Sequence, residues 1–533
     1  MALIERSRGL RVSHVLSHRA TTDSGAPFLL THDEEVTFGE VESLAESLAA
    51  ALSNLGIESG DRVAVVLPCC PEFVVSVFAL AKLGAVLVPL SPRLTESELQ
   101  YRLRHSEAVC AVTVESFHGV DFLQVFEELF PLLPELQYLV TVGEEDLWYD
   151  DRIFQFEDLI SAGAGRDFDA PEAASTSELF AIVYTSGTTG KPKGVELTHE
   201  NVVHAAAETV RSIDLGGEDR VIGVTALFHV FGLGPGVLGS VLAGSALILQ
   251  SEFEPAESLD LIEHHRATVH YGVPTVFAAE LREHRTRSRD LSSLRCGLVA
   301  GAPLGEELHQ RIEEQLCPNL LAAYSLTEAA STVAMTRLDD PVEKRRFTVG
   351  RPVDGMRVRV LEQDGTELPV ESLGEIAVHG PGVMRGYYRQ PKETSGCFDS
   401  EGYFRTGDLG IVDDEGYLHL VGRRKEVIIR GGSNVYPREI EDRLHAHPAV
   451  QDAAVVGVQD PILGEAVCAA VVPIEGAIVT GEELTEWCRR TLADYKIPDS
   501  VQFLDELPMT GTGKVRRAEL ARLLEAGEEG PSN

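Results

Sequence analysis

The chain has 533 residues, 44% of them hydrophobic, which is enough to bury several cores and to form three or four domains of about 150 residues each. Its 84 acidic residues outnumber its 46 basic ones, and the net charge of −38 repels polyanions at long range, so nucleic acid is excluded as a favoured partner. Eight cysteines without C-x-x-C spacing indicate neither a disulfide framework nor a zinc site. With an N-terminus that lacks an apolar core, they favour a reducing, cytoplasmic location.

Helix and strand patterns alternate in the N-terminal part. Thr37 and Glu40 have capping-box spacing and precede apolar residues at helical spacing over 41–55. An apolar strand over 63–67 follows, and then a helix over 71–84 that starts at a proline. Strands that are apolar throughout indicate parallel sheets covered on both faces, so the sequence predicts an α/β fold.

Residues 221–251 contain no Asp, Glu, Lys or Arg and are long enough to span a membrane. Pro235 and the five glycines between Gly232 and Gly244 favour a buried αβ segment instead. The sequence therefore predicts no transmembrane segment, and it leaves peripheral membrane contact and the oligomeric state open.

The pattern of apolar and turn residues changes twice after this α/β part. We predict a large N-terminal domain over 1–424, whose part from about 346 to 424 is a β-rich subdomain because short strand-like runs are broken by turn residues. A small α+β C-terminal domain follows over 425–524, and the acidic Gly/Pro/Ser tail over 525–533 is predicted to be disordered.

The strongest local motif is Tyr184-Thr-Ser-Gly-Thr-Thr-Gly-Lys-Pro-Lys-Gly194, which follows an apolar run. Its hydroxyls, glycines and two lysines together are typical of a phosphate cradle. It is not a Walker A loop, because its two central glycines are too close and Lys191 precedes Pro192. The ordinary alternative is a flexible glycine-rich surface loop.

Six further motifs follow in the chain: Leu227–Gly232, Gly301–Pro303, Tyr324–Glu328, Gly402–Asp408, Gly422–Glu426 and Leu507–Lys514. Three of them have an ordinary interpretation when taken alone. His229 in an apolar run is usually a core residue, Asp408 after Thr-Gly is usually a turn residue, and Lys514 in a loop is usually exposed. His264, His265 and His270 lack metal-ligand spacing and are predicted to be surface or helix residues.

In this order the motifs resemble the adenylate-forming superfamily of acyl-CoA synthetases, peptide-synthetase adenylation domains and luciferases, over residues 35–524. The resemblance implies ATP, Mg²⁺ and coenzyme A as cofactors and a mobile C-terminal domain. It assigns the β- and γ-phosphates of ATP to Thr185, Ser186, Gly187, Thr188, Thr189, Gly190 and Lys193. It assigns adenine to Gly301, Ala302, Pro303 and Tyr324, and the ribose to Asp408 and Arg423.

The same resemblance implies the catalytic roles. Thr327 would meet the α-phosphate, Glu328 would bind Mg²⁺, Lys514 would stabilise the charge that develops in the transition state, and His229 would gate the acyl pocket. Lys425 would be the hinge of the C-terminal domain, and Gly432 would let the pantetheine of CoA pass close to the backbone. Ser325 stands where the family usually has glycine.

We therefore expect an ATP-dependent acid–thiol ligase that forms an acyl-adenylate and then an acyl-CoA, on a medium- or long-chain fatty acid. His229 stands where peptide-synthetase domains have an aspartate for the substrate amine, which argues against an amino acid. The alternatives are an aryl (coumarate-like) acid as substrate, delivery of the acyl group to a separate carrier protein, a catalytically silent binding protein, and a luciferase-like oxidation.

Overall fold

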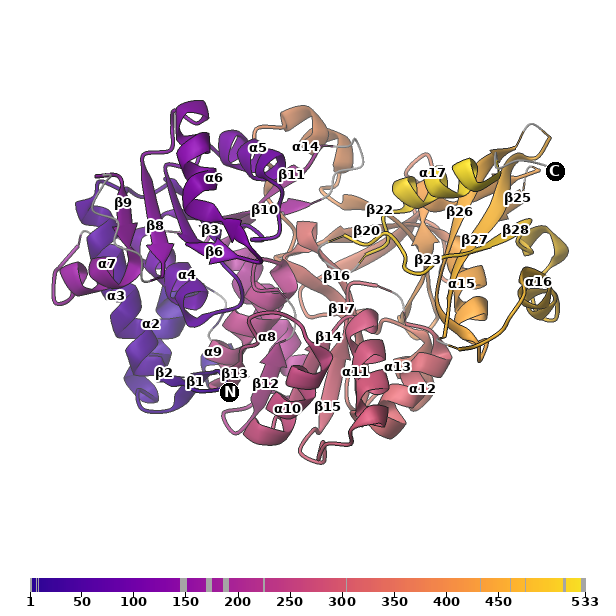
Figure 1. Cartoon of the computed structure of the whole chain (residues 1–533), viewed down its shortest axis with the longest axis horizontal. Coiled ribbons are helices and arrows are strands. Elements are labelled where there is room, and N and C mark those ends of the chain that lie inside the picture. Colours follow the sequence, from indigo (N-terminus) through magenta and orange to yellow (C-terminus); the bar gives the residue numbers. More distant parts are fainter. Residues whose placement is uncertain are drawn as a thin grey trace.

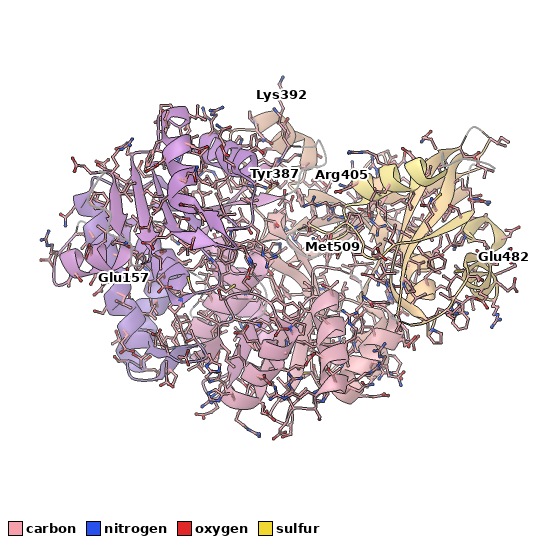
Figure 2. The ribbon with its side chains drawn as sticks, viewed as in Figure 1. Glu157, Tyr387, Lys392, Arg405, Glu482 and Met509 are labelled. Atoms are coloured by element: carbon pink, nitrogen blue, oxygen red, sulfur yellow. The ribbon has the colours of Figure 1, made fainter. Side chains whose placement is uncertain are left out.

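The computed structural model describes residues 2–5, 7, 9–143, 151–168, 175–185, 191–223, 226–302, 304–431, 433–460, 462–474, 476–510 and 514–528. Two large sheets with their helices form the bulk of the molecule, and the C-terminal part stands at one end of it, where α17 and β24–β28 lie together (Figure 1). The side chains of Tyr387, Arg405 and Met509 lie near the junction of these parts, whereas Lys392 and Glu482 project outward (Figure 2).

The first large sheet has eight strands in the order β21-β11-β10-β4-β3-β5-β8-β9. Its strands are β3 (Arg62–Val66), β4 (Val86–Pro89), β5 (Cys110–Val114), β8 (Tyr138–Val142), β9 (Ile153–Gln155), β10 (Leu179–Thr185), β11 (Lys193–Thr198) and β21 (Gly386–Tyr387). The strands from β10 to β9 pair in parallel, and β11 and β21 complete one edge in antiparallel pairing.

The second large sheet has nine strands in the order β18-β17-β16-β15-β14-β12-β13-β1-β2. Its strands are β1 (Pro27–Leu30), β2 (Glu35–Thr37), β12 (Arg220–Gly223), β13 (Ala246–Ile248), β14 (Val269–Gly272), β15 (Cys296–Val299), β16 (Leu320–Leu326), β17 (Ser331–Met335) and β18 (Arg351–Pro352). The central strands are parallel, and the pairs at both edges are antiparallel.

Helices cover both faces of the two sheets, so the predicted α/β class is confirmed. The helices of this part are α1 (Ala2–Glu5), α2 (Val12–Thr22), α3 (Phe38–Asn54), α4 (Pro71–Leu83), α5 (Glu96–Ser106), α6 (Phe122–Leu129), α7 (Phe156–Gly163), α8 (His199–Ser212), α9 (Gly239–Ala243), α10 (Pro255–His265), α11 (Pro274–Thr286), α12 (Glu306–Gln315) and α13 (Val342–Phe347). One continuous core contains side chains of both sheets and of α3, α4 and α8. A second core lies under α5 and α6, and a third under α10, α11 and α12.

The predicted N-terminal elements are present almost residue for residue. Thr37 and Glu40 form both hydrogen bonds of the capping box at the start of α3. Gly84 ends α4 in the left-handed conformation, with φ of +76°, which a glycine adopts without strain. The charge-free segment 221–251 forms β12, the π-helix η2 (Gly232–Leu238), α9 and β13. Within the described residues, no helix is long and apolar enough to cross a membrane.

Two smaller sheets follow. The first is antiparallel and contains β19 (Arg357–Leu361), β20 (Gly374–His379), β22 (Phe404–Val412) and β23 (Leu418–Arg423), with α14 (Pro391–Cys397) in a connection. The second contains β24 (Ile428–Arg430), β25 (Ser433–Val435), β26 (Val450–Asp460), β27 (Gly464–Pro473) and β28 (Ser500–Phe503), with α15 (Pro437–His445), α16 (Gly481–Arg489) and α17 (Arg517–Glu528). The short helix η4 (Arg424–Glu426) joins them.

The last helix runs into the segment that the sequence predicts to be a disordered tail. α17 runs to Glu528, so the first four residues that the sequence assigned to the tail are helical. Leu520 and Leu524 have no exposed surface and anchor α17 on the sheet formed by β26 and β27. The helix therefore continues past Leu524, where the sequence analysis placed the end of the C-terminal domain.

Candidate active site

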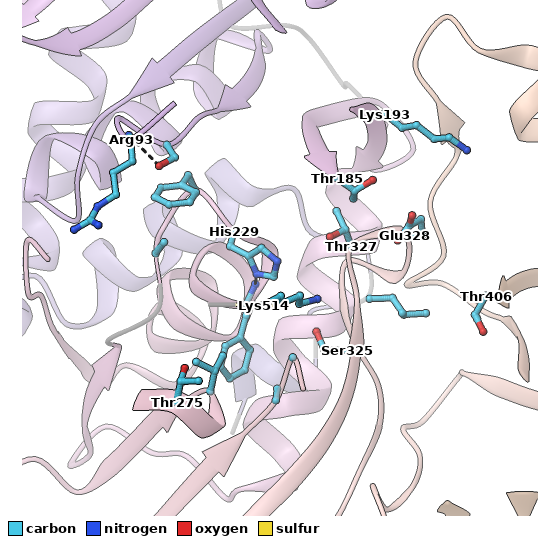
Figure 3. Close-up of a pocket in the computed structure, with 18 of the residues that line it drawn as sticks. Arg93, Thr185, Lys193, His229, Thr275, Ser325, Thr327, Glu328, Thr406 and Lys514 are labelled. Atoms are coloured by element: carbon cyan, nitrogen blue, oxygen red, sulfur yellow. Dashed lines mark hydrogen bonds between the residues drawn. The ribbon is translucent and has the colours of Figure 1, made fainter. Parts of the chain in front are cut away.

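A cavity of about 890 Å³ lies at the carboxyl ends of the parallel strands of both large sheets. This edge is where open α/β sheets bind ligands. The four-stranded sheet, the segment 423–425 and Lys514 close the cavity from the other side. Figure 3 shows His229 and Lys514 between an end that carries Thr185 and Glu328 and another that carries Thr275.

The predicted phosphate end is built on the hairpin of β10 and β11. Thr185 ends β10, Lys193 starts β11, and the two residues are register partners. Both side chains line the cavity. The intervening Ser186, Gly187, Thr188, Thr189 and Gly190 lie outside the described residues. The structure therefore places the two flanks of the predicted cradle at the cavity wall.

Thr327 and Glu328 follow β16 and line the same end of the cavity. Oε1 of Glu328 accepts a hydrogen bond of 3.0 Å from the hydroxyl of Tyr387. No cluster of three or more His, Cys, Asp or Glu side chains suited to a metal occurs among the described residues. One carboxylate fits Mg²⁺ nevertheless, because this ion is usually held by one or two carboxylates together with substrate phosphates and water.

The predicted ribose residues form a network in which Asp408 is buried behind the cavity wall and Arg423 lies on the wall. The hydroxyl of Tyr324 donates to Oδ2 of Asp408 at 2.6 Å, and Nε of Arg423 lies 2.8 Å from Oδ1. Burial raises the pKa of Tyr324 well above its usual value, so the phenol stays neutral and donates. The ring of Tyr324 is buried, and its hydroxyl is bonded to Asp408. The stacking of this ring on adenine stays a prediction.

Glu375 is a site residue that the sequence analysis missed. Its Oε1 accepts the N–H of Gly407 at 3.2 Å, and its Oε2 lies 3.0 Å from the guanidinium of Arg424. The backbone N–H of Asp408 is held in turn by the hydroxyl of Thr406 at 3.1 Å. An acidic residue inside the otherwise apolar strand β20 was the available signal, since such a residue is seldom buried without a partner.

Gly301, one of the predicted adenine residues, and Ser325 both line the cavity. Ala302 is exposed beside Gly301, and Pro303 lies outside the described residues. The hydroxyl of Ser325 lies 3.2 Å from that of Ser331. The side chain that stands where the family usually has glycine is therefore hydrogen-bonded within the protein.

His229 lies at the centre of the cavity, between Phe228 and Phe231 along the chain. Its Nδ1 accepts a weak hydrogen bond of 3.4 Å from the N–H of Phe231, which leaves Nε2 to carry the proton. Burial, and then the charge of Lys514, lowers the pKa of His229 to about 4. The imidazole is therefore neutral at physiological pH.

Lys514 reaches the cavity from the loop that precedes α17. The backbone N–H of Lys514 donates to the hydroxyl of Thr510 at 3.0 Å, and the N–H of Thr510 donates to the carbonyl of Lys514 at 2.7 Å. The side chain of Lys514 is exposed to solvent in the cavity. Burial by the surrounding protein is nevertheless the largest cause that lowers the pKa of Lys514, and the positive charge of Arg423 lowers it further. Asp408 and Glu328 oppose this shift, so the ammonium lies among the groups of the large domain.

The segment between the last two sheets also contributes to the cavity. Lys425 lines it, and burial followed by the charge of Arg423 lowers the lysine's pKa. Gly431 has φ of +56° and donates its N–H to the carbonyl of Leu463 at 2.7 Å. Gly432 lies outside the described residues.

A third arm of the cavity had no role in the sequence analysis. It is lined by Cys69, Arg93 and Glu252, from loops that follow strands of both large sheets. Nη2 of Arg93 lies 2.7 Å from Oε1 of Glu252, so an ion pair bridges the two sheets at the outer end of this arm.

Residues more than 300 positions apart thus meet in one cavity. Among the described residues, the predicted site residues on its wall are Thr185, Lys193, His229, Gly301, Thr327, Glu328, Arg423, Lys425 and Lys514. A large α/β domain carries a hairpin that is predicted to bind phosphate, and a small domain that supplies one lysine closes the cavity. This architecture defines the class of adenylate-forming enzymes.

Comparison with known proteins gives the same class. Residues 16–388 match the AMP-binding enzyme family, and residues 439–514 match the AMP-binding enzyme C-terminal domain. The chain is 36% identical over 489 residues to the feruloyl-CoA synthase of Amycolatopsis sp, which covers 91% of this chain and 94% of that one. It is 33% identical over 524 residues to the long-chain-fatty-acid–CoA ligase of Bacillus subtilis (strain 168), with coverage of 94% and 93%.

Among solved structures, ATP-bound MatB from Rhodopseudomonas palustris superimposes with a TM-score of 0.87 at 30% identity, over 97% of this chain and 99% of MatB. The chain belongs to the AMP-binding superfamily, in its acyl-CoA synthetase branch. It is an AMP-forming acyl-CoA ligase.

Proposed function

We propose that this ligase activates an apolar carboxylic acid, a fatty acid of medium chain length, and transfers it to coenzyme A. The observation that carries this proposal is the wall of the cavity beyond His229. It is formed by Phe228, Phe231, Val273, Thr275, Val276, Ala300 and Leu326, and no Asp, Glu, Lys or Arg belongs to this described part of the wall. A charged or zwitterionic side chain would lose its hydration there without a partner, so an apolar acyl group fits best.

The depth of this arm supports a limited chain length. Phe231 is 3% exposed, and its ring centroid lies 5.5 Å from that of Tyr271, which has no exposed surface. The two rings form a floor between the cavity and the core that contains α8 and η2. An acyl chain much longer than the arm would have to displace a packed aromatic ring, which costs several kcal/mol in a close-packed interior.

The arrangement suits an in-line attack of the acid on ATP. A carboxylate oxygen attacks the α-phosphorus, the bond to the bridging oxygen of the β-phosphate breaks, and pyrophosphate leaves. Lys514 would stabilise the negative charge that gathers on the α-phosphate and carboxylate oxygens, with Thr327 donating from the other side. Mg²⁺ beside Glu328 would offset the charge of the triphosphate.

Asp408 would fix the ribose, and with it the α-phosphate, because Tyr324 and Arg423 already hold its carboxylate. Neutral His229 would face the reacting carboxylate without adding a positive charge that competes with Lys514.

In the second step the thiol attacks the acyl carbonyl, a thioester bond forms and AMP leaves. Lys514 occupies the cavity in the observed arrangement, so we propose that the small domain turns about Lys425 and withdraws it before the thiol enters. Cys69 and Arg93 line the same cavity as His229, and Arg93 lies on the other side of His229 from Thr185 (Figure 3), which supports this arm as the route of the thiol.

The test is AMP formation by the purified protein with ATP, Mg²⁺ and CoA over straight-chain acids from four to eighteen carbons and over cinnamic acids. We expect a maximum at medium chain length and formation of the acyl-CoA. A maximum on cinnamic acids would favour the aryl alternative, and a stalled acyl-adenylate that is released only by a carrier protein would identify the other acceptor. Absence of AMP with every acid would overturn the proposal.

A further inference from the structure

One tyrosine side chain contacts both of the charged groups that are proposed to hold the triphosphate and its metal. The hydroxyl of Tyr387 donates to Oε1 of Glu328 at 3.0 Å. The ammonium of Lys193 lies 4.5 Å from the centroid of the same ring, within the range of a cation–π interaction. Tyr387 itself lines the cavity.

The backbone fixes Tyr387 relative to Lys193. Tyr387 lies on β21, opposite Val195 on the strand that Lys193 begins. The next residue, Tyr388, donates its N–H to the carbonyl of Gly194 at 2.7 Å. The N–H of Tyr387 is satisfied by the hydroxyl of Thr394 at 2.9 Å, which ties the strand to α14. Tyr387 and Lys193 therefore belong to one hydrogen-bonded unit.

The segment before β21 fixes Glu328 in the same way. The N–H of Met384 donates to the carbonyl of Glu328 at 2.8 Å, so the backbone of Glu328 and the ring that contacts its carboxylate are held by neighbouring residues. Tyr387 is 8% exposed, which leaves its ring little freedom to move.

Tyr387 contacts two groups of opposite charge. Lys193 and Glu328, both within the described part of the chain, form no direct ion pair, and the phenol contacts one and the ring the other. A direct pair would turn both groups away from a metal-bound triphosphate.

We propose that Tyr387 is a positioning residue, which aims the Glu328 carboxylate at the magnesium ion and the Lys193 ammonium at the phosphates of ATP. This inference rests on the roles proposed above for Lys193 and Glu328. It adds a contact that neither motif contains, because Tyr387 comes from a strand about 190 residues beyond the phosphate hairpin.

The test compares two variants at fixed ATP while free Mg²⁺ is varied. Tyr387→Phe keeps the ring and removes the donor to Glu328. We expect the Mg²⁺ concentration for half-maximal AMP formation to rise by about 10- to 100-fold, the usual effect of losing a partner that orients a metal ligand. The KM for the carboxylic acid should not change, because the acyl arm is untouched.

Tyr387→Leu removes the ring as well and should raise the KM for ATP by a further factor of about 2 to 30, the range of a cation–π contact. Tyr388→Phe is the matched control, because Tyr388 is the adjacent tyrosine and its ring packs beside His105, away from the cavity. We expect it to behave as the wild type in both titrations.

A second measurement does not depend on turnover. Calorimetric titration of ATP with and without Mg²⁺ should show that the gain in ATP affinity brought by Mg²⁺ is smaller in Tyr387→Phe than in the wild type. If the gain is equal, or if Tyr387→Phe raises the KM of the acid as much as the Mg²⁺ requirement, the positioning role is wrong. A wild type that forms no AMP would instead overturn the proposed function, while calorimetry would still decide the role of Tyr387.

Discussion

The two ends of the cavity are built in different ways. At the proposed nucleotide end, the side chains proposed to act are held by polar partners, as Asp408 is held by Tyr324 and Arg423. At the acyl end, the wall consists of packed apolar groups such as Phe231. The first kind of site depends on the presence of particular atoms, whereas the second depends on volume and shape. Substitutions at the first end should therefore reduce activity or ATP binding, whereas substitutions at the second end should change which acid is preferred.

The largest effect is expected at Lys514. Lys514→Ala removes the cation proposed to stabilise the transition state, so adenylate formation should fall by about a hundredfold or more. Thioester formation from supplied acyl-AMP should be retained. Both half-reactions are measured separately, with Arg516→Ala as control, since Arg516 is an exposed cation two residues away that pairs with Glu519. An equal loss of both half-reactions would show that Lys514 does not act in adenylation alone.

A smaller effect is expected at the ribose network. Asp408→Asn keeps the volume of the side chain and removes its charge, so hydrogen bonds to a charged acceptor are lost, and the KM for ATP should rise by about 10- to 100-fold. Pyrophosphate release at varied ATP measures this, and Asp364→Asn in an exposed turn is the control. An unchanged KM for ATP would mean that Asp408 serves the fold and not the nucleotide.

At the acyl end we expect a shift of preference. Phe231→Ala opens the floor above Tyr271, so acids longer than the wild-type optimum should gain about fourfold in kcat/KM for each methylene that becomes buried. The measurement is kcat/KM over the series of straight-chain acids. Phe253→Ala, in the third arm of the cavity, should leave the optimum where it is. The same optimum in Phe231→Ala would refute the proposed floor.

The smallest effect concerns pH. The pKa of His229 is lowered to about 4 from an ordinary value near 6.5, so the unfolded chain binds a proton between these values that the folded chain does not. Stability should therefore rise with pH in this window and be lost as the pH falls from 6.5 toward 4.

Urea midpoints at pH 7, 5.5 and 4.5 measure this loss, which should be smaller in His229→Gln than in the wild type and unchanged in His264→Gln, whose side chain is exposed. Since His229 stays neutral above pH 5.5, it should add no acid limb to the rate profile. A limb near pH 6.5 that disappears in His229→Gln would contradict this assignment.

The sequence by itself determined the elements and the polar groups. The capping box at Thr37, the strand before Thr185 and the continuous apolar strands follow from local rules, because the hydrogen bonds and periodicities involved span a few residues. The motifs that end at Glu328, Asp408 and Lys514 could also be found in the sequence, since each contains a charged group suited to the role proposed for it.

Only the tertiary structure decided which groups hold these residues in place. Tyr387 contacts the site from a strand whose local sequence gives no sign of this role, and Glu375 was marked only as an acidic residue in a mostly apolar strand, without any indication of its partners. His270, predicted as a surface or helix residue, is instead buried on β14 with its Nε2 2.8 Å from the carboxylate of Glu280. The physical reason is the same in each case, because a partner that arrives from a distant strand or helix is set by sheet order and helix packing, which no local pattern contains.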